Sequence, residues 1–385
     1  MPEPRFLTAI SVIFCVSGAA LSNWFPRIPD TRAKLDLTYD ELGIALFCVG
    51  GGAMVSMLVT GALIRRLGSR GITRVMGVAT CAALPLIPFA NSLLTLSAAL
   101  LLFGALVGSL DVAMNAQAAH GENLQGRKFL NRVHGFFSVG TLIGAGMGAG
   151  AAALDVPLTL HLPMAAAILG LFMLASLPFL LDDRTAHADD APAMALPKGP
   201  LWGLGIIAFC ALLAEGAMAD WSAIYLRDIF EAGPTFAAAG FGAFAVTMTL
   251  GRLSGDWIGH HVDDARLMQA CGAALFIGIG LIVGAPVAPV ALAGFAVVGA
   301  GISIVFPIAI RFAAGSGIVS PGLAIAAVAT AGYTGLLAGP PLIGFMAERI
   351  GLTASLATIL VGGVVIAGLG SRVMGSGDKG PAKGA

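Results

Sequence analysis

Residues 104–118, GALVGSLDVAMNAQA, decide the fold, because they set one carboxylate and one amide within a run of small and apolar residues. Asp111 and Asn115 lie four positions apart, and on a helix this spacing places both side chains on the same face. An ionisable side chain in a membrane helix is expected to face a bundle interior or a water-filled path. The stretch therefore predicts a membrane helix that lines a polar route, provided that the rest of the chain belongs in a membrane.

The composition of the chain places it in a membrane. Of its 385 residues, 57% are hydrophobic and only 11% are charged, whereas about a quarter of the residues of a soluble domain are charged. The 53 glycines lie among aliphatic runs, where they suit close helix packing in lipid. The 21 basic and 21 acidic residues give a net charge of zero, so nothing indicates a nucleic-acid partner.

Several other functions are disfavoured by the sequence. The five cysteines lie far apart in apolar runs without a CxxC pair, which argues against disulfides and metal sites. No cofactor is predicted. There is no phosphate-cradling GxxxxGK[ST] loop, and no polar segment is long enough for a catalytic domain, so we expect neither ATP hydrolysis nor an enzyme. The apolar run at the N-terminus continues to Trp24 without an obvious cleavage site, so it is interpreted as a first span and not as a signal peptide.

Windows of about 20 apolar residues predict an all-α membrane protein with twelve spans. They fall near residues 6–26, 40–63, 72–90, 94–118, 134–154, 158–181, 201–226, 236–258, 266–284, 288–312, 321–346 and 352–373. The longest polar interruption, DDRTAHADDAPAMALPKG at 182–199, leaves six spans on either side. We therefore expect an N-terminal six-helix bundle over 1–181, a cytoplasmic linker over 182–199 and a C-terminal six-helix bundle over 200–385.

Lys and Arg give the orientation. With the N-terminus in the cytoplasm, sixteen of the 21 basic residues fall in inner segments and five in outer ones. This bias predicts that both termini are cytoplasmic, in agreement with the even number of spans.

The two halves also repeat. Asn23-Trp24 returns as Asp220-Trp221 after 197 positions, the loop GALIRRLGSR (61–70) as RLSGDWIGHH (252–261) after 191, and Gly108 as Gly301 after 193. Three similar offsets indicate a duplicated six-helix unit, and parallel repeats of this kind describe one large transporter fold.

Twelve spans in two sets of six, together with the loop GALIRRLGSR, resemble the major facilitator superfamily, whose signature loop after the second helix reads roughly G-x-L-x-D-R-x-G-R-R. The matching residues are Gly61, Leu63, Arg66, Gly68 and Arg70, while Arg65 stands where the family has its acid. In the second half, Asp256 and Gly259 occupy the corresponding acid and glycine positions. NWFPRIP (23–29), LDVAMNAQA (110–118) and HGFFSVGTLIGA (134–145) resemble the fucose-permease-like branch of bacterial inner-membrane porters. The resemblance implies a monomer with a central cavity lined by helices one, four, seven and ten.

Two acids are candidates for proton coupling. Desolvation favours the neutral form of a carboxyl group, which suits a step that couples proton binding to solute binding. The resemblance implies this role for Asp111, and the alternative is a structural acid that pairs with neighbouring helices. Asn115 is a candidate for solute binding or for helix pairing. Glu215 and Asp220 lie in the seventh span and are five residues apart, so they cannot both point straight at one ligand. Glu215 is the second candidate for the proton, and Asp220 is a solute ligand or an outer-gate partner of Arg27 or Arg227.

Aromatic and amide side chains near the outer ends of the first and seventh spans are further candidates for solute binding. Asn23-Trp24 and Asp220-Trp221 would stack on and hydrogen-bond a sugar ring, although aromatic residues at this depth are also common membrane anchors. Tyr333 and Tyr225 are weaker candidates of the same kind.

The cytoplasmic loops are predicted to gate. Pseudo-symmetry brings Asp256 toward Arg132 and His134, and we expect an inner closure of these side chains, next to the basic loop that holds Arg65 and Arg66. The alternative is a set of solvated loops with no gating role.

Together these features predict a secondary active transporter in the bacterial inner membrane, with lipid, protons and a small solute as its partners. Its function is interpreted as proton-coupled symport of a sugar or similar small polar solute. A proton-coupled exporter of drugs or metabolites, a passive facilitator and a membrane receptor of the same fold are the alternatives.

Overall fold

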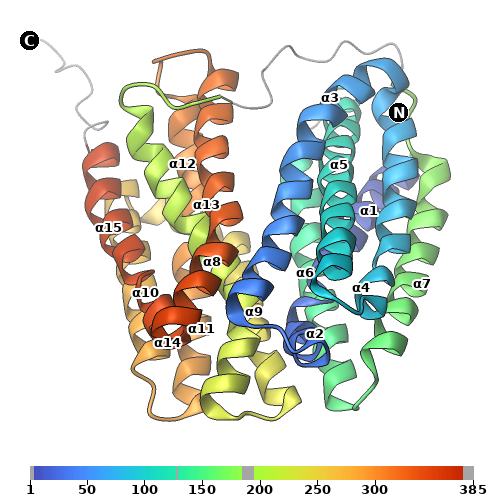
Figure 1. Ribbon diagram of the computed structural model, residues 1–385. Helices are drawn as coiled ribbons and strands as arrows, with labels where there is room; N and C mark the ends of the chain where they lie inside the picture. The colour runs from blue at the N-terminus through green and yellow to red at the C-terminus, as the bar shows by residue number, and fades with distance from the viewer. Residues whose placement is uncertain (1–3, 127–128, 184–194, 376–385) are drawn as a thin grey trace, which may run out of the picture. The chain divides into compact units, whose positions relative to one another are not determined.

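The computed structural model describes residues 4–126, 129–183 and 195–375, apart from the side chains of Asn131 and Asp256. The described residues are almost entirely helical, as predicted (Figure 1). The first half holds α1 (Pro4–Ser22), η1 (Phe25–Arg27), α2 (Ile28–Leu35), α3 (Tyr39–Ala83), α4 (Leu86–Phe89), α5 (Leu93–Gln125), α6 (Leu130–Ala153), α7 (Leu158–Ser176) and η2 (Leu177–Phe179). The second half holds α8 (Leu201–Phe230), α9 (Pro234–His261), α10 (Asp264–Val283), α11 (Ala288–Ile302), α12 (Val305–Ala314), α13 (Pro321–Ile350), α14 (Leu352–Ala357) and α15 (Leu360–Gly375).

Eleven helical segments of the described residues are long and apolar enough to cross a membrane, one fewer than predicted. The difference lies in the segment Tyr39–Phe89, whose 51 residues are about twice the length that one span needs. Two helices meet inside it at Gly68, where φ is 76° and ψ is 152°. Glycine adopts this backbone conformation without the clash that a Cβ would cause. The predicted second span is therefore the first part of α3, and the predicted third span consists of the second part of α3 together with α4. The chain is a multi-pass membrane protein.

A buried polar cluster holds the kink in α3. The carboxylate of Asp183 accepts hydrogen bonds from the backbone N–H of Ser69 at 2.8 Å and of Arg70 at 3.2 Å, so it caps the first turn after the kink. The side-chain amide of Gln117 donates to Ser69 Oγ at 2.7 Å and to the backbone oxygen of Leu181 at 3.0 Å. The loop that resembles the family signature is thus fixed by side chains from α5 and from the chain just after α7.

Glycines bring neighbouring helices into backbone contact at matching places in the two halves. A Cβ on Gly104 in α5 would lie 2.0 Å from the backbone oxygen of Val49 in α3, and these helices run side by side (Figure 1). A Cβ on Gly299 in α11 would lie 2.4 Å from the backbone oxygen of Phe244 in α9. Both members of the second contact follow the first by 195 positions. The same packing is therefore built twice.

A second pair of glycine contacts has the same register. A Cβ on Gly140 in α6 would lie 1.9 Å from the backbone oxygen of Cys15 in α1, and one on Gly335 in α13 would lie 2.3 Å from that of Phe209 in α8. These residues are 195 and 194 positions apart in the two halves. The three sequence landmarks, with offsets of 197, 193 and 191, all lie outside this register, so they indicate the repeat but do not mark equivalent positions in the two halves.

Two compact units make up the structure. Unit 1 consists of Met1–Asp190 and Ala223–Gly242, and unit 2 of Ala191–Ser222 and Ala243–Ala385. The end of α8 and the start of α9 therefore group with the first six spans. Most of the predicted linker, residues 184–194, lies outside the described part of the chain.

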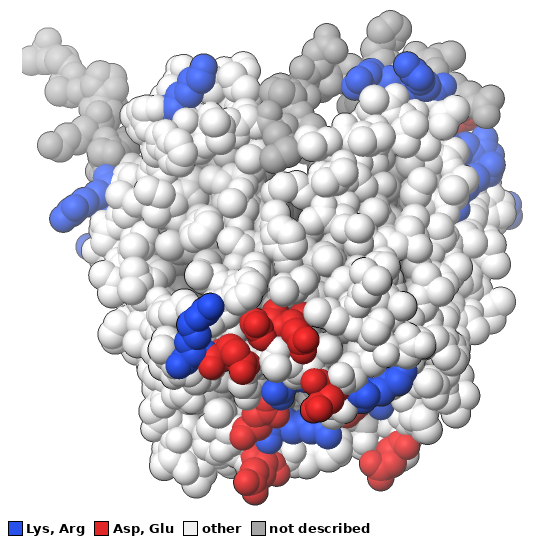
Figure 2. Space-filling model, viewed as in Figure 1, with Lys and Arg blue, Asp and Glu red and all other residues white. Residues whose placement is uncertain are grey.

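The surface suits a lipid environment. Figure 2 shows a face that is mostly uncharged, with its charged side chains gathered into a few groups. Large apolar side chains lie exposed on the helices, among them Leu94 at 79%, Leu171 at 68% and Val361 at 64% exposure. Such side chains are expected to contact acyl chains, because a soluble protein does not expose apolar surface on this scale.

Candidate functional site

Asp111 in α5 begins a chain of polar side chains that continues into α6. Nδ2 of Asn115 donates to the backbone oxygen of Asp111 at 2.9 Å and lies 3.3 Å from its carboxylate Oδ1. Nε2 of His134 lies 3.0 Å from Oδ1 of Asn115. The predicted placement of Asp111 and Asn115 on one face of a helix is therefore confirmed, and His134 joins them from a second helix.

The acceptors in this chain fix the direction of its hydrogen bonds. Both atoms that Asn115 contacts at Asp111 are oxygens, so the amide must turn its NH₂ group toward them and its oxygen toward His134. Nε2 of His134 must then carry the hydrogen and donate it. Asp111 and Asn115 are half-buried and His134 is exposed, with its ring packed edge-on against Phe14 of α1 at 5.2 Å between centroids. Two titratable groups are thus oriented by one amide between them.

Glu215 in α8 forms an ion pair with an arginine. Nη2 of Arg252 in α9 lies 3.0 Å from Oε1 and 3.1 Å from Oε2 of Glu215. The two side chains are 26% and 33% exposed, so the pair is partly withdrawn from solvent. One indication of this ion pair was present in the sequence: Arg252 lies inside the predicted span 236–258, and a charged side chain within a span usually pairs with an opposite charge.

The pairs near the outer ends of the first and seventh spans are buried. Trp24 is 2% exposed, and its indole N–H donates to Thr31 Oγ1 at 2.8 Å. Asp220 is 9% exposed and Trp221 is fully buried. The ring faces of Trp24 and Trp221 are therefore enclosed by protein in this conformation. The structure does not turn them toward an open site.

Asn23 differs from its neighbours. It is fully buried, its Nδ2 lies 3.6 Å from Sδ of Met147, and its Oδ1 has no hydrogen-bond partner among the described residues. A buried amide oxygen without a donor is costly and suits a ligand hydroxyl or a water molecule. Tyr333 on α13 is 40% exposed, with its ring 6.1 Å from that of Phe306.

The predicted inner gate is described only in part. Arg65, Arg66 and Arg132 are exposed in unit 1. His134 contacts Asn115, as described above. The side chain of Asp256 lies outside the described part of the structure, so its pairing with Arg132 or His134 stays a prediction.

Two clusters of ion pairs in unit 1 were missed by the sequence analysis. Asp30 accepts from Nε of Arg27 at 2.5 Å and from Nη1 of Arg227 at 2.8 Å. The two arginines named as gate partners of Asp220 therefore both pair with Asp30. Arg27 is 4% exposed and also donates to the backbone oxygen of Val156 at 2.9 Å.

The second cluster lies on Asp228, which accepts from Nη1 of Arg32 at 2.5 Å and from the hydroxyl of Tyr39 at 2.9 Å. The guanidinium of Arg32 also stacks over the Tyr39 ring, 4.2 Å from its centroid. Together the two clusters join the segment between the first two spans to the end of α8. We refer to Arg27, Asp30, Arg32, Tyr39, Arg227 and Asp228 as the α2–α8 ion-pair cluster.

No group of three or more His, Cys, Asp or Glu side chains that could hold a metal ion occurs within residues 4–126, 129–183 and 195–375. The five cysteines are all free thiols.

Comparison with known proteins agrees with this architecture. A family model described as Major Facilitator Superfamily matches residues 10–317. An uncharacterised MFS-type transporter of Yersinia pestis is 35% identical over 343 residues, which cover 89% of each chain. Among solved structures, the nucleoside transporter NupG aligns with a TM-score of 0.75 at 13% identity, over 98% of this chain and 100% of its own. The human organic anion transporter MFSD10 aligns with a TM-score of 0.64 at 17% identity, over 96% and 99%.

Proposed function

The chain belongs to the major facilitator superfamily and is a transporter of that family, and we propose that it is a proton-coupled symporter of a sugar or a similar small polar solute. It would work by alternating access in a bacterial inner membrane, with both termini in the cytoplasm. The fucose-permease-like branch is the part of the family to which we assign it.

The polar chain of Asp111, Asn115 and His134 is the observation that carries this proposal. A proton coupler needs a carboxyl group that is partly withdrawn from water and still reachable by protons. Asp111 is half-buried in a span and is oriented by an amide, while His134 at the other end of the chain is exposed. In the proposed cycle, Asp111 takes up a proton as the solute binds and loses it toward the cytoplasm, which resets the carrier.

Glu215 is the less suitable proton site of the two. Its carboxylate is already neutralised by Arg252, which contacts both of its oxygens. A carboxylate held by a guanidinium gives up part of that pairing when it is protonated. We propose that Glu215 and Arg252 contribute to solute binding or to helix pairing, and that Asp111 carries the proton.

Solute binding is proposed to involve Asn23, Asn115, Asp220 and Tyr333. The unpaired oxygen of Asn23 supports a hydroxyl-bearing solute, since it offers an acceptor that the described protein does not use. Trp24 and Trp221 would support these contacts from within the packed helices. The proposed solute class is therefore sugars and related polyols or nucleosides, the last because one similar fold is that of a nucleoside transporter.

The α2–α8 ion-pair cluster is proposed to close the outer side. In the proposed topology both segments lie outside the membrane, and alternating access requires that such contacts form and break once in each cycle. The cluster combines several charge pairs in one place, which favours a stable closure, and the pairs remain able to separate because most of these side chains keep some exposure to water.

Uptake into proteoliposomes tests the symport proposal. Ligands are first found by thermal shift with sugars, polyols and nucleosides, and uptake is then measured with and without a pH gradient. One pH unit is worth about 1.36 kcal/mol for each proton, so a one-proton symporter accumulates its solute up to about tenfold. The Asp111→Asn variant should equilibrate the solute without accumulating it, whereas Asp36→Asn, a matched change at an exposed residue, should leave accumulation unchanged.

Accumulation by Asp111→Asn equal to that of the unchanged protein would contradict the proton role of Asp111. Equilibration without accumulation by the unchanged protein would instead identify a passive facilitator, and gradient-driven efflux would identify the exporter.

A further inference from the structure

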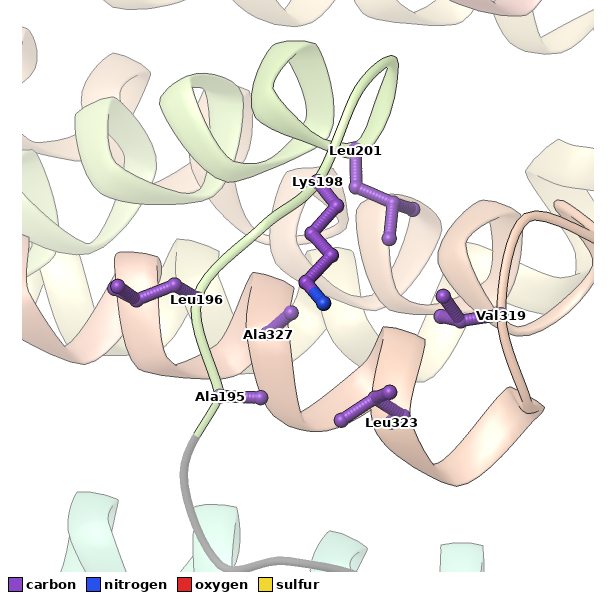
Figure 3. Close-up of a pocket in the computed structure, with 7 residues that line it drawn as sticks. All are labelled: Ala195, Leu196, Lys198, Leu201, Val319, Leu323 and Ala327. Carbon is purple, nitrogen blue, oxygen red and sulfur yellow. The ribbon is translucent and has the colours of Figure 1, made fainter.

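Unit 2 contains a pocket lined by aliphatic side chains and by one basic side chain, that of Lys198. The pocket has a volume of about 290 Å³ and lies between the chain that enters α8 and the first turns of α13. Its walls include Leu201, Val319, Leu323 and Ala327. Figure 3 shows the side chain of Lys198 extending between these walls, with its nitrogen in the space that they enclose.

The walls of the pocket are held in place by the surrounding packing. Leu201 and Ala327 line the pocket and are each 1% exposed. The backbone N–H of Ala195 donates to Thr330 Oγ1 at 3.3 Å, which fastens the entering chain to α13. Leu196 is 73% exposed at the rim. The pocket is therefore a formed feature of the fold with an open, apolar edge.

Both chain segments that form the pocket belong to predicted inner segments. Lys198 is the second-to-last residue of the predicted cytoplasmic linker, and Val319 lies in the loop between the tenth and eleventh spans, which is also predicted to be cytoplasmic. In this predicted topology, the pocket would lie at the level where the headgroups of the inner leaflet meet their acyl chains. This leaflet is rich in anionic lipids, and basic sites between helices on this side bind such headgroups.

We propose that this pocket binds an anionic phospholipid of the inner leaflet. One acyl chain would lie along the leucine and valine side chains, and the ammonium of Lys198 would pair with the lipid phosphate. The lining offers aliphatic surface and a single positive charge, which is the complement of an anionic amphiphile. A sugar-like solute has no matching groups here, because apart from Lys198 the lining side chains are Ala, Val and Leu.

Native mass spectrometry of the purified full chain tests this proposal, with phosphatidylglycerol and phosphatidylcholine as probes. We expect phosphatidylglycerol to be retained more strongly than phosphatidylcholine. Removal of one interfacial cation weakens anionic-lipid binding by about 1 kcal/mol, or about fivefold. Lys198→Gln should therefore lose about fivefold in phosphatidylglycerol affinity, and Lys198→Arg should retain it. Arg372→Gln removes an exposed charge from the last turn of α15 and serves as the matched control that should not change binding.

The acyl-chain part of the proposal has its own test. Leu323→Asn places an amide in the pocket wall and should weaken the binding of both phosphatidylglycerol and phosphatidylcholine. Size-exclusion chromatography is used to show that the variant is folded. Soluble sn-glycerol 1-phosphate should not compete, because it lacks the chain. The proposal would be overturned if Lys198→Gln bound phosphatidylglycerol as tightly as the unchanged protein. It would also be overturned if Arg372→Gln lost as much phosphatidylglycerol affinity as Lys198→Gln, or if glycerol phosphate competed with the lipid. These measurements do not depend on transport, so they stand apart from the symport proposal.

Discussion

Removing one member of the Glu215–Arg252 pair should destabilise the protein more than removing both. An exposed ion pair contributes about 0.2–1 kcal/mol, whereas breaking a buried one costs about 3–5 kcal/mol, because a charge is left unpaired. Side chains that are 26% and 33% exposed lie between these limits. We therefore expect about 2 kcal/mol of destabilisation for Glu215→Gln and for Arg252→Gln, and less than about 1 kcal/mol for the double variant, which leaves no unpaired charge.

Thermal unfolding in detergent, followed by tryptophan fluorescence, measures this effect. At roughly 2 °C per kcal/mol for a protein of this size, each single variant should unfold about 4 °C below the unchanged protein, and the double variant should recover most of that loss. A double variant that unfolds at the sum of the two single shifts would show that the side chains do not interact, and would refute the reasoning.

The same variants separate the two candidate proton sites. A protein that retains Asp111 should still accumulate solute against its gradient when Glu215 and Arg252 are both glutamine. Accumulation is measured at steady state, so that slower uptake caused by weaker solute binding does not hide the coupling. Loss of accumulation in that double variant, together with normal accumulation in Asp111→Asn, would move the proton to Glu215.

Two further predictions concern helix packing and the outer closure. Gly104→Ala places a methyl group 2.0 Å from a backbone oxygen, so it should destabilise the folded protein by about 1–3 kcal/mol and lower the yield of folded protein on size-exclusion chromatography. In the control variant Gly146→Ala the methyl group meets nothing within 4 Å, so the yield should not fall. Equal yields of the two variants would contradict the packing argument. Asp228→Asn removes an ion pair and weakens a hydrogen bond of the α2–α8 ion-pair cluster, so amide hydrogen exchange of residues 28–35 should rise about fivefold for about 1 kcal/mol. Asp263→Asn, which removes an exposed ion pair with Arg266 in unit 2, should leave this exchange unchanged. Equal exchange in the two variants would contradict the closure role.

The positions of the spans, and the helix face shared by Asp111 and Asn115, could be predicted from the sequence. Both follow from local rules, namely the length of apolar runs and the 3.6-residue period of a helix. The sequence analysis did not predict that the second and third spans join at Gly68 in one kinked helix. The length of an apolar run shows where a span ends, but it does not show whether the backbone between two spans remains helical. The count of eleven segments instead of twelve has this local cause.

The partners of the charged residues could not be predicted in the same way. Helices that are apolar on every side have no polar stripe to show how they are rotated against their neighbours. Arg252 could be placed in the eighth span, but its contact with Glu215 depends on the rotation of α8 and α9. The burial of Trp24 and Trp221 was missed for a related reason, since residue type alone does not separate a membrane anchor or a ligand contact from a core residue.

The departure of the signature loop from the family pattern has a structural counterpart in unit 1. Arg65 stands where the family has an acid, and it is exposed. The carboxylate that serves this loop is instead that of Asp183, which binds two backbone N–H groups at the start of the second part of α3. A helix start carries partial positive charge, so a carboxylate there stabilises the turn whichever part of the chain supplies it. The missing acid therefore does not leave the kink unsupported, and replacement of Asp183 should disturb the loop more than replacement of Arg65.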